Sequence, residues 1–170
     1  MRTPRESALA LLGRRPYSAG EMRRALARKF PSDPNLEETI AELRAAGYLD
    51  DAKIAAQVAA SLARNHAFGP ARIRQELKRR LFDFRVIEPA LESAFEAASE
   101  RELLEKALHK KLRGMRLPLT PQKLRSLIQS LLRRGFRAGD IMKAVRRRAE
   151  LEPIAESVDA DNEQEEITNC

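Results

Sequence analysis

Residues 68–77, FGPARIRQEL, are predicted to begin a helix. A similar pattern of residue types occurs 51 residues earlier in the chain and again 51 residues later. The counterparts are residues 17–26, YSAGEMRRAL, and residues 119–128, LTPQKLRSLI. In each copy a capping residue (serine, glycine or threonine) is followed by alanine or proline, as is typical of a helix start. The matched sets are Tyr17/Phe68/Leu119, Met22/Ile73/Leu124, Arg23/Arg74/Arg125 and Leu26/Leu77/Ile128. A repeat of this length predicts a modular, quasi-linear protein that presents long surfaces rather than single pockets.

Apolar residues at helical spacing predict three helices in each copy, nine in all. This divides the chain into three-helix repeats at residues 1–49, 50–96 and 97–149, followed by an acidic, disordered tail at 150–170. Beyond the middle helix of the third repeat, the spacing to the second repeat grows from 51 to 54, as in Phe82/Phe136 and Ile87/Ile141. That middle helix is therefore expected to be three residues longer than its counterpart. Alanine, leucine, arginine and glutamate dominate the chain, which favours an all-α fold.

The positive charge is concentrated in residues 1–149. The whole chain has 32 lysines and arginines against 25 acidic residues, but residues 150–170 hold eight of those acidic residues and no basic one. The rest of the chain therefore carries a net charge of +15. This balance favours a polyanion, or a protein coated with one, as the partner. The alternative is a soluble protein that merely has a high arginine content.

The sequence contains no pattern that indicates catalysis or metal binding. His66 and His109 have no cysteine partner and no metal-ligand spacing, and no Gly-x-x-x-x-Gly-Lys-Ser/Thr loop is present to hold nucleotide phosphates. Acidic pairs such as Asp50-Asp51 precede helices, where the helix dipole accounts for them. We therefore expect no enzyme activity, no cofactor and no metal. The absence of a long apolar run or signal-peptide core, and a single cysteine at Cys170, favour a cytoplasmic protein without a membrane partner.

Three segments of the chain resemble the RecX family. They are GYLDD at residues 47–51, FGPARIRQEL at 68–77 and LLRRGF at 131–136; with the triple three-helix layout the resemblance covers residues 4–149. Two positions depart from the family pattern. Lys53-Ile54 stands where an aromatic residue usually follows the acidic pair, and the turn LFDF at 81–84 has no glycine where one is typical.

The resemblance implies a non-enzymatic modulator of the RecA recombinase, built as an elongated, curved array of tandem repeats. RecX-like proteins lie in the groove of the RecA–single-stranded DNA filament and contact successive protomers. They thereby suppress ATP hydrolysis, co-protease activity and strand exchange, which affects recombination, DNA repair and the SOS response. We expect the chain to be a monomer whose partner is the RecA filament, with single-stranded DNA contacted weakly or indirectly.

The candidate contact residues are basic side chains outside the apolar stripes. Arginine suits phosphate and carboxylate recognition because its planar fork forms paired hydrogen bonds. Arg74 and Lys78 lie one helical turn apart, so their joint reversal to glutamate is expected to weaken inhibition of the partner while leaving the fold and its melting nearly unchanged. The predicted partner- or DNA-binding residues are Arg72, Arg74, Lys78, Arg79, Lys123, Arg125, Arg133, Arg134, Arg137, Lys143, Arg146 and Arg147.

Each of these features has an alternative reading. The basic residues could form a solvated helix face with local pairs such as Arg72–Glu76 and Glu76–Arg80. Phe82 and Phe136 could stack on bases, although their matched positions in the repeat favour the core. At the level of function, compact three-helix units also resemble helix-turn-helix modules, so a direct DNA-binding protein is the main rival hypothesis. A purely structural scaffold fits less well with the strong positive charge.

Overall fold

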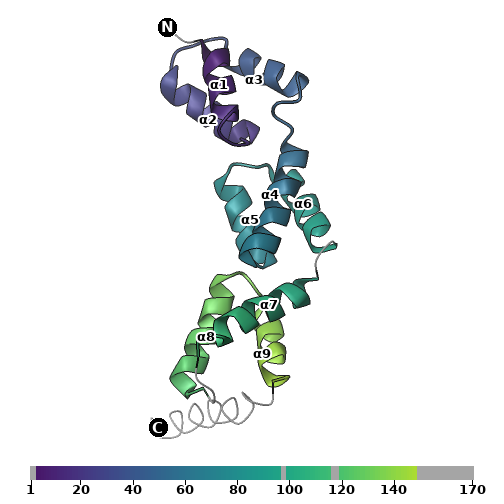
Figure 1. Ribbon diagram of the computed structural model, residues 1–170. Coiled ribbons are helices and arrows are strands. Elements are labelled where there is room, and N and C mark those ends of the chain that lie inside the picture. Colours follow the sequence, from purple (N-terminus) through teal and green to yellow (C-terminus); the bar gives the residue numbers. More distant parts are fainter. Residues whose placement is uncertain (1–2, 97–98, 116–118, 149–170) are drawn as a thin grey trace, which may run out of the picture. The chain divides into compact units, whose positions relative to one another are not determined.

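The computed structural model describes residues 3–96, 99–115 and 119–148, and within these ranges the chain forms nine α-helices (Figure 1). The predicted all-α fold class is confirmed. The predicted tail at residues 150–170 lies outside the described residues. None of the described helices is both long and apolar enough to cross a bilayer. The helices are α1 (Pro4–Leu12), α2 (Ala19–Lys29), α3 (Leu36–Ala45), α4 (Asp51–His66), α5 (Pro70–Arg79), α6 (Phe84–Glu96), α7 (Glu100–Leu112), α8 (Pro121–Arg133) and α9 (Ala138–Arg146).

The helix starts follow the capping signals in the sequence. The Ser18 side chain accepts a hydrogen bond from the Glu21 backbone N–H, while the Glu21 side chain accepts one from the Ser18 N–H, so α2 begins with a complete capping box. At the start of α8 the Thr120 side chain accepts a hydrogen bond from the Lys123 N–H, and Pro121 takes the first helical position. The structure also confirms the longer middle helix, since α8 has 13 residues and α5 has 10.

Contacts among residues divide the chain into two compact units. The first unit comprises Met1–Leu62 and Ile73–Ala97, and the second comprises Ala63–Arg72 and Ala98–Cys170. The boundary therefore passes through α4 and α5, so neither unit coincides with the repeats expected from the sequence.

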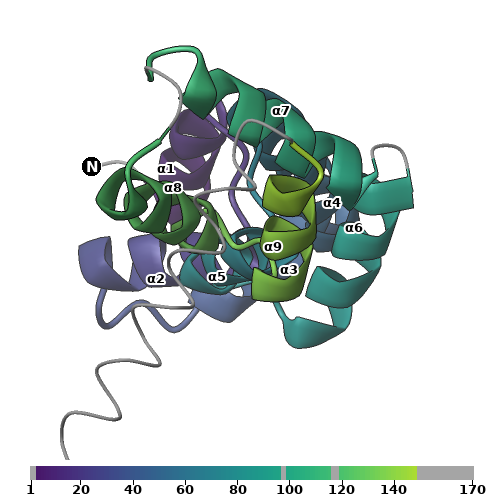
Figure 2. The ribbon, with the colours of Figure 1, turned by 90° about the horizontal axis from the view of Figure 1, so that it is seen from below.

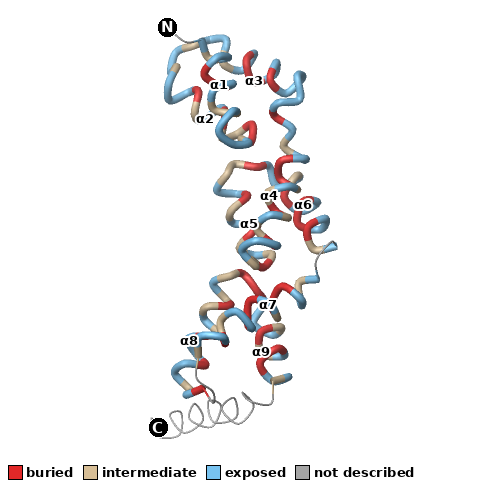
Figure 3. Tube along the Cα trace, in the orientation of Figure 1, coloured by how far each residue is buried: buried red, intermediate tan, exposed pale blue. Residues whose placement is uncertain are grey.

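In the first unit, helices α1, α2 and α3 pack against one another around a small apolar core. Its fully or almost fully buried members include Met22, Leu26, Ile40 and Leu43, and Tyr17 and Phe30 pack against them from the edge. Figure 3 shows the buried positions interspersed with exposed ones along each helix, as expected of thin amphipathic layers.

The first unit also contains a junction between the first and second repeats. The Ser18 hydroxyl donates to the Arg80 carbonyl oxygen at 2.5 Å, and the Ala19 N–H donates to the Asp51 carboxylate at 2.8 Å. Gly20 lies so close to Leu81 that an added Cβ would be 2.5 Å from the Leu81 carbonyl oxygen. The start of α2 is thus fixed by Asp51, the first residue of α4, and by the residues that follow α5.

In the second unit, helices α7, α8 and α9 pack against one another, as the two views in Figures 1 and 2 show. Their buried faces include Leu108 on α7, Leu124 and Leu131 on α8, and Ile141 on α9. Ile128, which the repeat matches to Leu26 and Leu77, is only half-buried. Leu127 and Leu131 occupy the buried positions instead, because the three extra residues of α8 change which side of its later turns faces the core.

The second unit contains a junction like that of the first unit, but different atoms form its hydrogen bonds. The Gly69 N–H donates to the Arg134 carbonyl oxygen at 2.7 Å, and the Ala71 N–H donates to the Gly135 carbonyl oxygen at 3.3 Å. Arg134 lies 54 residues after Arg80, and Gly69 lies 51 residues after Ser18, so the same two positions of the repeat meet in both units. A hydroxyl makes the contact in the first unit and a backbone N–H makes it in the second.

The turn after α5 lacks the typical glycine, and Leu81 adopts the left-handed backbone conformation there. Leu81 has a φ of 58°, in the left-handed region, and Gly135 occupies the matching turn of the third repeat with a φ of 87°. Glycine adopts this conformation freely, whereas leucine does so at a cost of about 1–2 kcal/mol. The departure from the family pattern therefore leaves the turn intact but strained. Phe82 and Phe136, which follow these two residues, are 6% and 4% exposed, so they are core residues as predicted.

Candidate partner-binding surface

Two of the three repeat-matched arginines are held by a glutamate of the next helix. Arg23 on α2 donates from Nε and Nη2 to the Glu37 carboxylate on α3 at 2.6 and 2.8 Å. Arg74 on α5 donates in the same way to Glu88 on α6 at 2.7 and 2.8 Å. These arginine hydrogen bonds hold the pKa of Glu37 and of Glu88 below the ordinary value. We call this paired contact the arginine brace, and it ties the second helix of a repeat to the third.

The arginine brace revises the expected outcome of reversing Arg74 and Lys78 to glutamate. The reversal places two carboxylates beside Glu88 and removes an ion pair that, being exposed, contributes only about 0.2–1 kcal/mol. We therefore expect a modest fall in melting temperature, measurable by circular dichroism, where the sequence alone predicted almost none. The charge swap Arg74→Glu with Glu88→Arg should restore most of the loss. Equal melting of the reversal and the wild type would show that the brace contributes nothing to stability.

Several other predicted contact residues also interact within their own unit. The Arg134 guanidinium donates to the His66 carbonyl oxygen at the end of α4, at 2.8 Å, and so caps that helix. The Arg72 guanidinium lies 5.7 Å from the centre of the Phe68 ring. Ion pairs join Arg79 to Glu76, Lys143 to Asp140 and Arg147 to Glu105.

Arg80 shows where the solvated-face interpretation fails. That alternative interpretation pairs Arg80 locally with Glu76, but the Arg80 guanidinium reaches Glu21 at 3.4 Å and the Pro16 carbonyl oxygen at 2.8 Å. Arg80 therefore fastens the start of α2 within the first unit. Sequence periodicity could not find this role, because 59 residues separate Arg80 from Glu21.

The remaining predicted residues form the best candidates for an external anion. These residues are exposed, and their side chains make no hydrogen bond or ion pair within the described part of the chain: Lys78, Lys123, Arg125, Arg133, Arg137 and Arg146. Lys123, Arg125 and Arg133 all lie on α8, a helix whose sequence PQKLRSLIQSLLR contains no acidic residue. Most of these unpaired cations therefore belong to α8 or lie at the two ends of α9.

A mixed-charge pocket of about 350 Å³ lies between α7 and α9 in the second unit. Lys143 and Arg147 line it together with Glu100 and Asp140. Burial raises the pKa of Glu100, with the nearby Asp140 adding to the effect and Arg137 opposing it. Because acidic and basic side chains alternate here, this pocket is less suited to a polyanion than the exposed face of α8 is.

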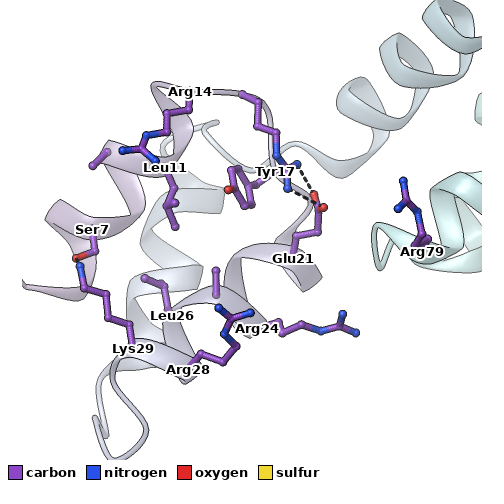
Figure 4. A pocket seen from close by; sticks show the side chains of 13 residues that line it. Ser7, Leu11, Arg14, Tyr17, Glu21, Arg24, Leu26, Arg28, Lys29 and Arg79 are labelled. Atoms are coloured by element: carbon purple, nitrogen blue, oxygen red, sulfur yellow. Dashed lines mark hydrogen bonds and ion pairs between the residues drawn. The ribbon is translucent and has the colours of Figure 1, made fainter.

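A basic surface on the first repeat was not foreseen from the sequence. A pocket of about 700 Å³ opens between α1 and α2, with Leu11, Tyr17 and Leu26 among its apolar lining residues (Figure 4). Its basic lining residues are Arg14, Arg15, Arg24, Arg28, Lys29 and Arg79. Arg24 and Arg28 lie one helical turn apart, which is the signal that could have indicated this surface. Of these basic lining residues, only Arg79 is among the contacts predicted from the sequence, which all fall in residues 72–147.

Within this surface, Glu21 is the point where several cations converge. Its carboxylate accepts two hydrogen bonds from Arg15, at 2.9 and 3.0 Å, and is also close to Arg80 (Figure 4 shows the Arg15 contacts). Partial burial acts to raise the pKa of Glu21. The Arg15 hydrogen bonds, the Arg80 charge and the Ser18 N–H outweigh burial, so the pKa lies below its ordinary value of 4.5.

This depressed pKa predicts acid sensitivity of the first unit. A carboxyl group with a lower pKa in the folded state adds stability above the unfolded pKa of 4.5, and that stability is lost as the pH falls through the folded-state value. We expect urea denaturation to show a falling free energy of unfolding below that pH. The matched variant Glu21→Gln should be less stable at neutral pH and lose less on acidification. A parallel acid dependence of the two proteins would exclude Glu21 as a contributor.

Comparison with known proteins identifies the family. Residues 5–43 match the family model described as the first three-helix domain of RecX, and residues 50–91 match the second. The regulatory protein RecX of Stenotrophomonas maltophilia (strain R551-3) is 31% identical over 147 residues, covering 85% of this chain and 86% of that protein. The regulatory protein RecX of Chromobacterium violaceum is 33% identical over 138 residues, covering 81% and 85%. The chain therefore belongs to the RecX family of regulatory proteins.

Solved structures support the fold. The crystal structure of RecX from Lactobacillus salivarius matches with a TM-score of 0.72 at 19% identity, covering 85% of this chain and 93% of that one. A second crystal structure, of a regulatory protein RecX, matches with a TM-score of 0.65 at 22% identity, covering 82% and 70%. At these identities the likeness concerns the fold alone.

Proposed function

We propose that this protein is a negative regulator of RecA that binds in the groove of the RecA–single-stranded DNA filament. In that position it suppresses the ATPase, co-protease and strand-exchange activities of the filament, and so modulates recombination and the SOS response. The observation that carries the proposal is the match to regulatory proteins named RecX along more than four-fifths of the chain. We further propose that the protein acts in the cytoplasm as a monomer, without a cofactor.

The charge and the repeats support this proposal on physical grounds. A partner built of identical protomers is well met by a ligand built of similar modules, because linked weak contacts strengthen one another through effective concentration. The net charge of +15 in residues 1–149 suits a partner that carries nucleic acid or acidic side chains. The unpaired cations of α8 lie on one of these modules.

The test is the ATPase activity of RecA on single-stranded DNA with sub-stoichiometric amounts of the full chain. A filament regulator should suppress turnover well below one copy per RecA protomer. In parallel, binding to the same DNA without RecA should be measured at 50 and 200 mM salt. A plain DNA-binding protein would inhibit only near saturation of the DNA, and its affinity would fall about 10³–10⁵-fold between these salt concentrations if it neutralised about six to ten phosphates. That second pattern would contradict the proposal.

A further inference from the structure

The third repeat lacks the acceptor of the arginine brace. Arg125 is the counterpart of Arg23 and Arg74, each of which directly follows a buried apolar residue of its helix. The acceptors Glu37 and Glu88 likewise follow Leu36 and Ile87 in their helices, and the matching position after Ile141 is Met142. The third repeat has thus kept the arginine and replaced its carboxylate partner by a thioether, which is at best a weak hydrogen-bond acceptor.

Arg125 consequently presents an unused guanidinium fork. It is exposed, and it makes no hydrogen bond or ion pair with any other residue within 3–96, 99–115 and 119–148. Its helix contributes two more exposed cations, Lys123 and Arg133, and no acidic residue that could pair with it. Guanidinium groups favour acceptors that present two oxygen atoms side by side, so the natural ligand here is an oxyanion.

Two observations favour a carboxylate over a phosphate of nucleic acid. The chain itself binds carboxylates at both equivalent positions, with almost the same distances in the two repeats. Proteins that bind single-stranded nucleic acids combine basic side chains with exposed aromatic side chains on which the bases stack. The one aromatic side chain that the described residues of the third repeat contain, Phe136, is buried.

We propose that Arg125 binds an aspartate or glutamate side chain of the protein partner, which takes the place of the glutamate that the third repeat has lost. This inference rests on the proposed function, because the partner in question is a RecA protomer of the filament. It assigns the third repeat a defined point of attachment, whereas Arg23 and Arg74 serve mainly to hold their own repeats together.

The decisive variant is Met142→Glu, which rebuilds the arginine brace in the third repeat. The new carboxylate should capture Arg125 internally, leave the fold intact or slightly stabilised, and weaken binding to the filament roughly tenfold or more. Arg125→Ala should weaken filament binding to a similar extent. In the double variant the two effects should not add, because both remove the same guanidinium from the partner. Binding can be followed by fluorescence anisotropy of the full chain labelled at Cys170, its only cysteine, on filaments assembled with a non-hydrolysable nucleotide.

Gly114→Glu provides the control for added negative charge. Gly114 lies in the third repeat outside α9, is exposed, and has nothing within 4 Å of an added Cβ. This variant should bind the filament within about twofold of the wild type, since it adds the same charge outside the brace position. All variants should also be tested on the single-stranded oligonucleotide alone, where Arg125→Ala and Met142→Glu are expected to have little effect.

The outcomes separate this inference from the proposed function. If the wild type binds the filament and the variants Arg125→Ala and Met142→Glu bind it with the same affinity, the role of Arg125 is overturned. The proposed function would still stand in that case. An equal loss on bare oligonucleotide would mean that Arg125 contacts phosphate, which also overturns the carboxylate assignment. If Gly114→Glu weakened binding as much as Met142→Glu, net charge would replace the brace as the explanation. Failure of the wild type to bind filaments would refute both.

Discussion

Replacing Gly135 by alanine is expected to destabilise the second unit strongly, by about 2–5 kcal/mol. Gly135 has a φ of 87°, which is unfavourable for any residue with a side chain. In addition, a Cβ at this position would lie 2.6 Å from the Arg72 Cβ, much closer than two such atoms approach in proteins. Because Arg72 belongs to the first turn of α5, the clash would also disturb the hydrogen bonds from Gly69 and Ala71. Urea denaturation followed by circular dichroism measures the loss.

Gly47→Ala separates the two causes. Gly47 has a similar φ of 75°, but an added Cβ there meets no atom within 4 Å. This variant should therefore lose only the conformational component, about 1–2 kcal/mol. If both variants were destabilised equally, close packing at the junction would contribute nothing, and the turn conformation alone would explain the need for glycine.

Replacing Gly20 by alanine is also expected to destabilise the protein, although alanine is the better helix former. Gly20 is the second residue of α2, where the exchange would ordinarily gain up to about 1 kcal/mol. At this position, however, the new Cβ would lie 2.5 Å from the Leu81 carbonyl oxygen and 2.7 Å from the Leu81 Cβ. We expect overpacking to dominate, with a net loss of about 1–3 kcal/mol in the free energy of unfolding.

Gly139→Ala is the matched control because Gly139 is also the second residue of its helix, α9. Nothing lies within 4 Å of its added Cβ, so the same chemical change should stabilise the protein slightly. Opposite signs for the two variants would show that the junction, not helix propensity, decides the outcome. A stabilised Gly20→Ala variant would refute the close contact between α2 and the turn after α5.

Much of the fold could be predicted because its signals are local. Ser18 and Thr120 each precede a helix by one residue, and the apolar positions recur along each helix with its own period. The extra three residues of α8 were visible as a change in repeat spacing. Core positions such as Phe82 and Phe136 followed from their matched places in the repeat, and their burial confirms them.

The candidate surface was less predictable, because charge pairing depends on residues far apart in the chain. Arg74 and Arg134 looked like free cations in the sequence, yet they bind Glu88 and the His66 carbonyl oxygen. Arg24 and Arg28 are not among the contact residues predicted from the sequence, although they line the basic pocket of the first repeat. A helical period shows which side of a helix turns away from the core. It does not show which neighbouring side chain lies opposite.

By itself, then, the sequence determined the nine helices, their apolar sides and the excess of positive charge, since each depends on neighbouring residues within a few turns. Tertiary structure decided which basic side chains bind an acceptor within the chain and which remain unpaired. It also decided which glycines are indispensable, since Gly20 and Gly135 are constrained by residues 61 and 63 positions away. The physical reason is that hydrogen bonds and steric contacts act over a few ångströms in space, whatever the separation along the chain.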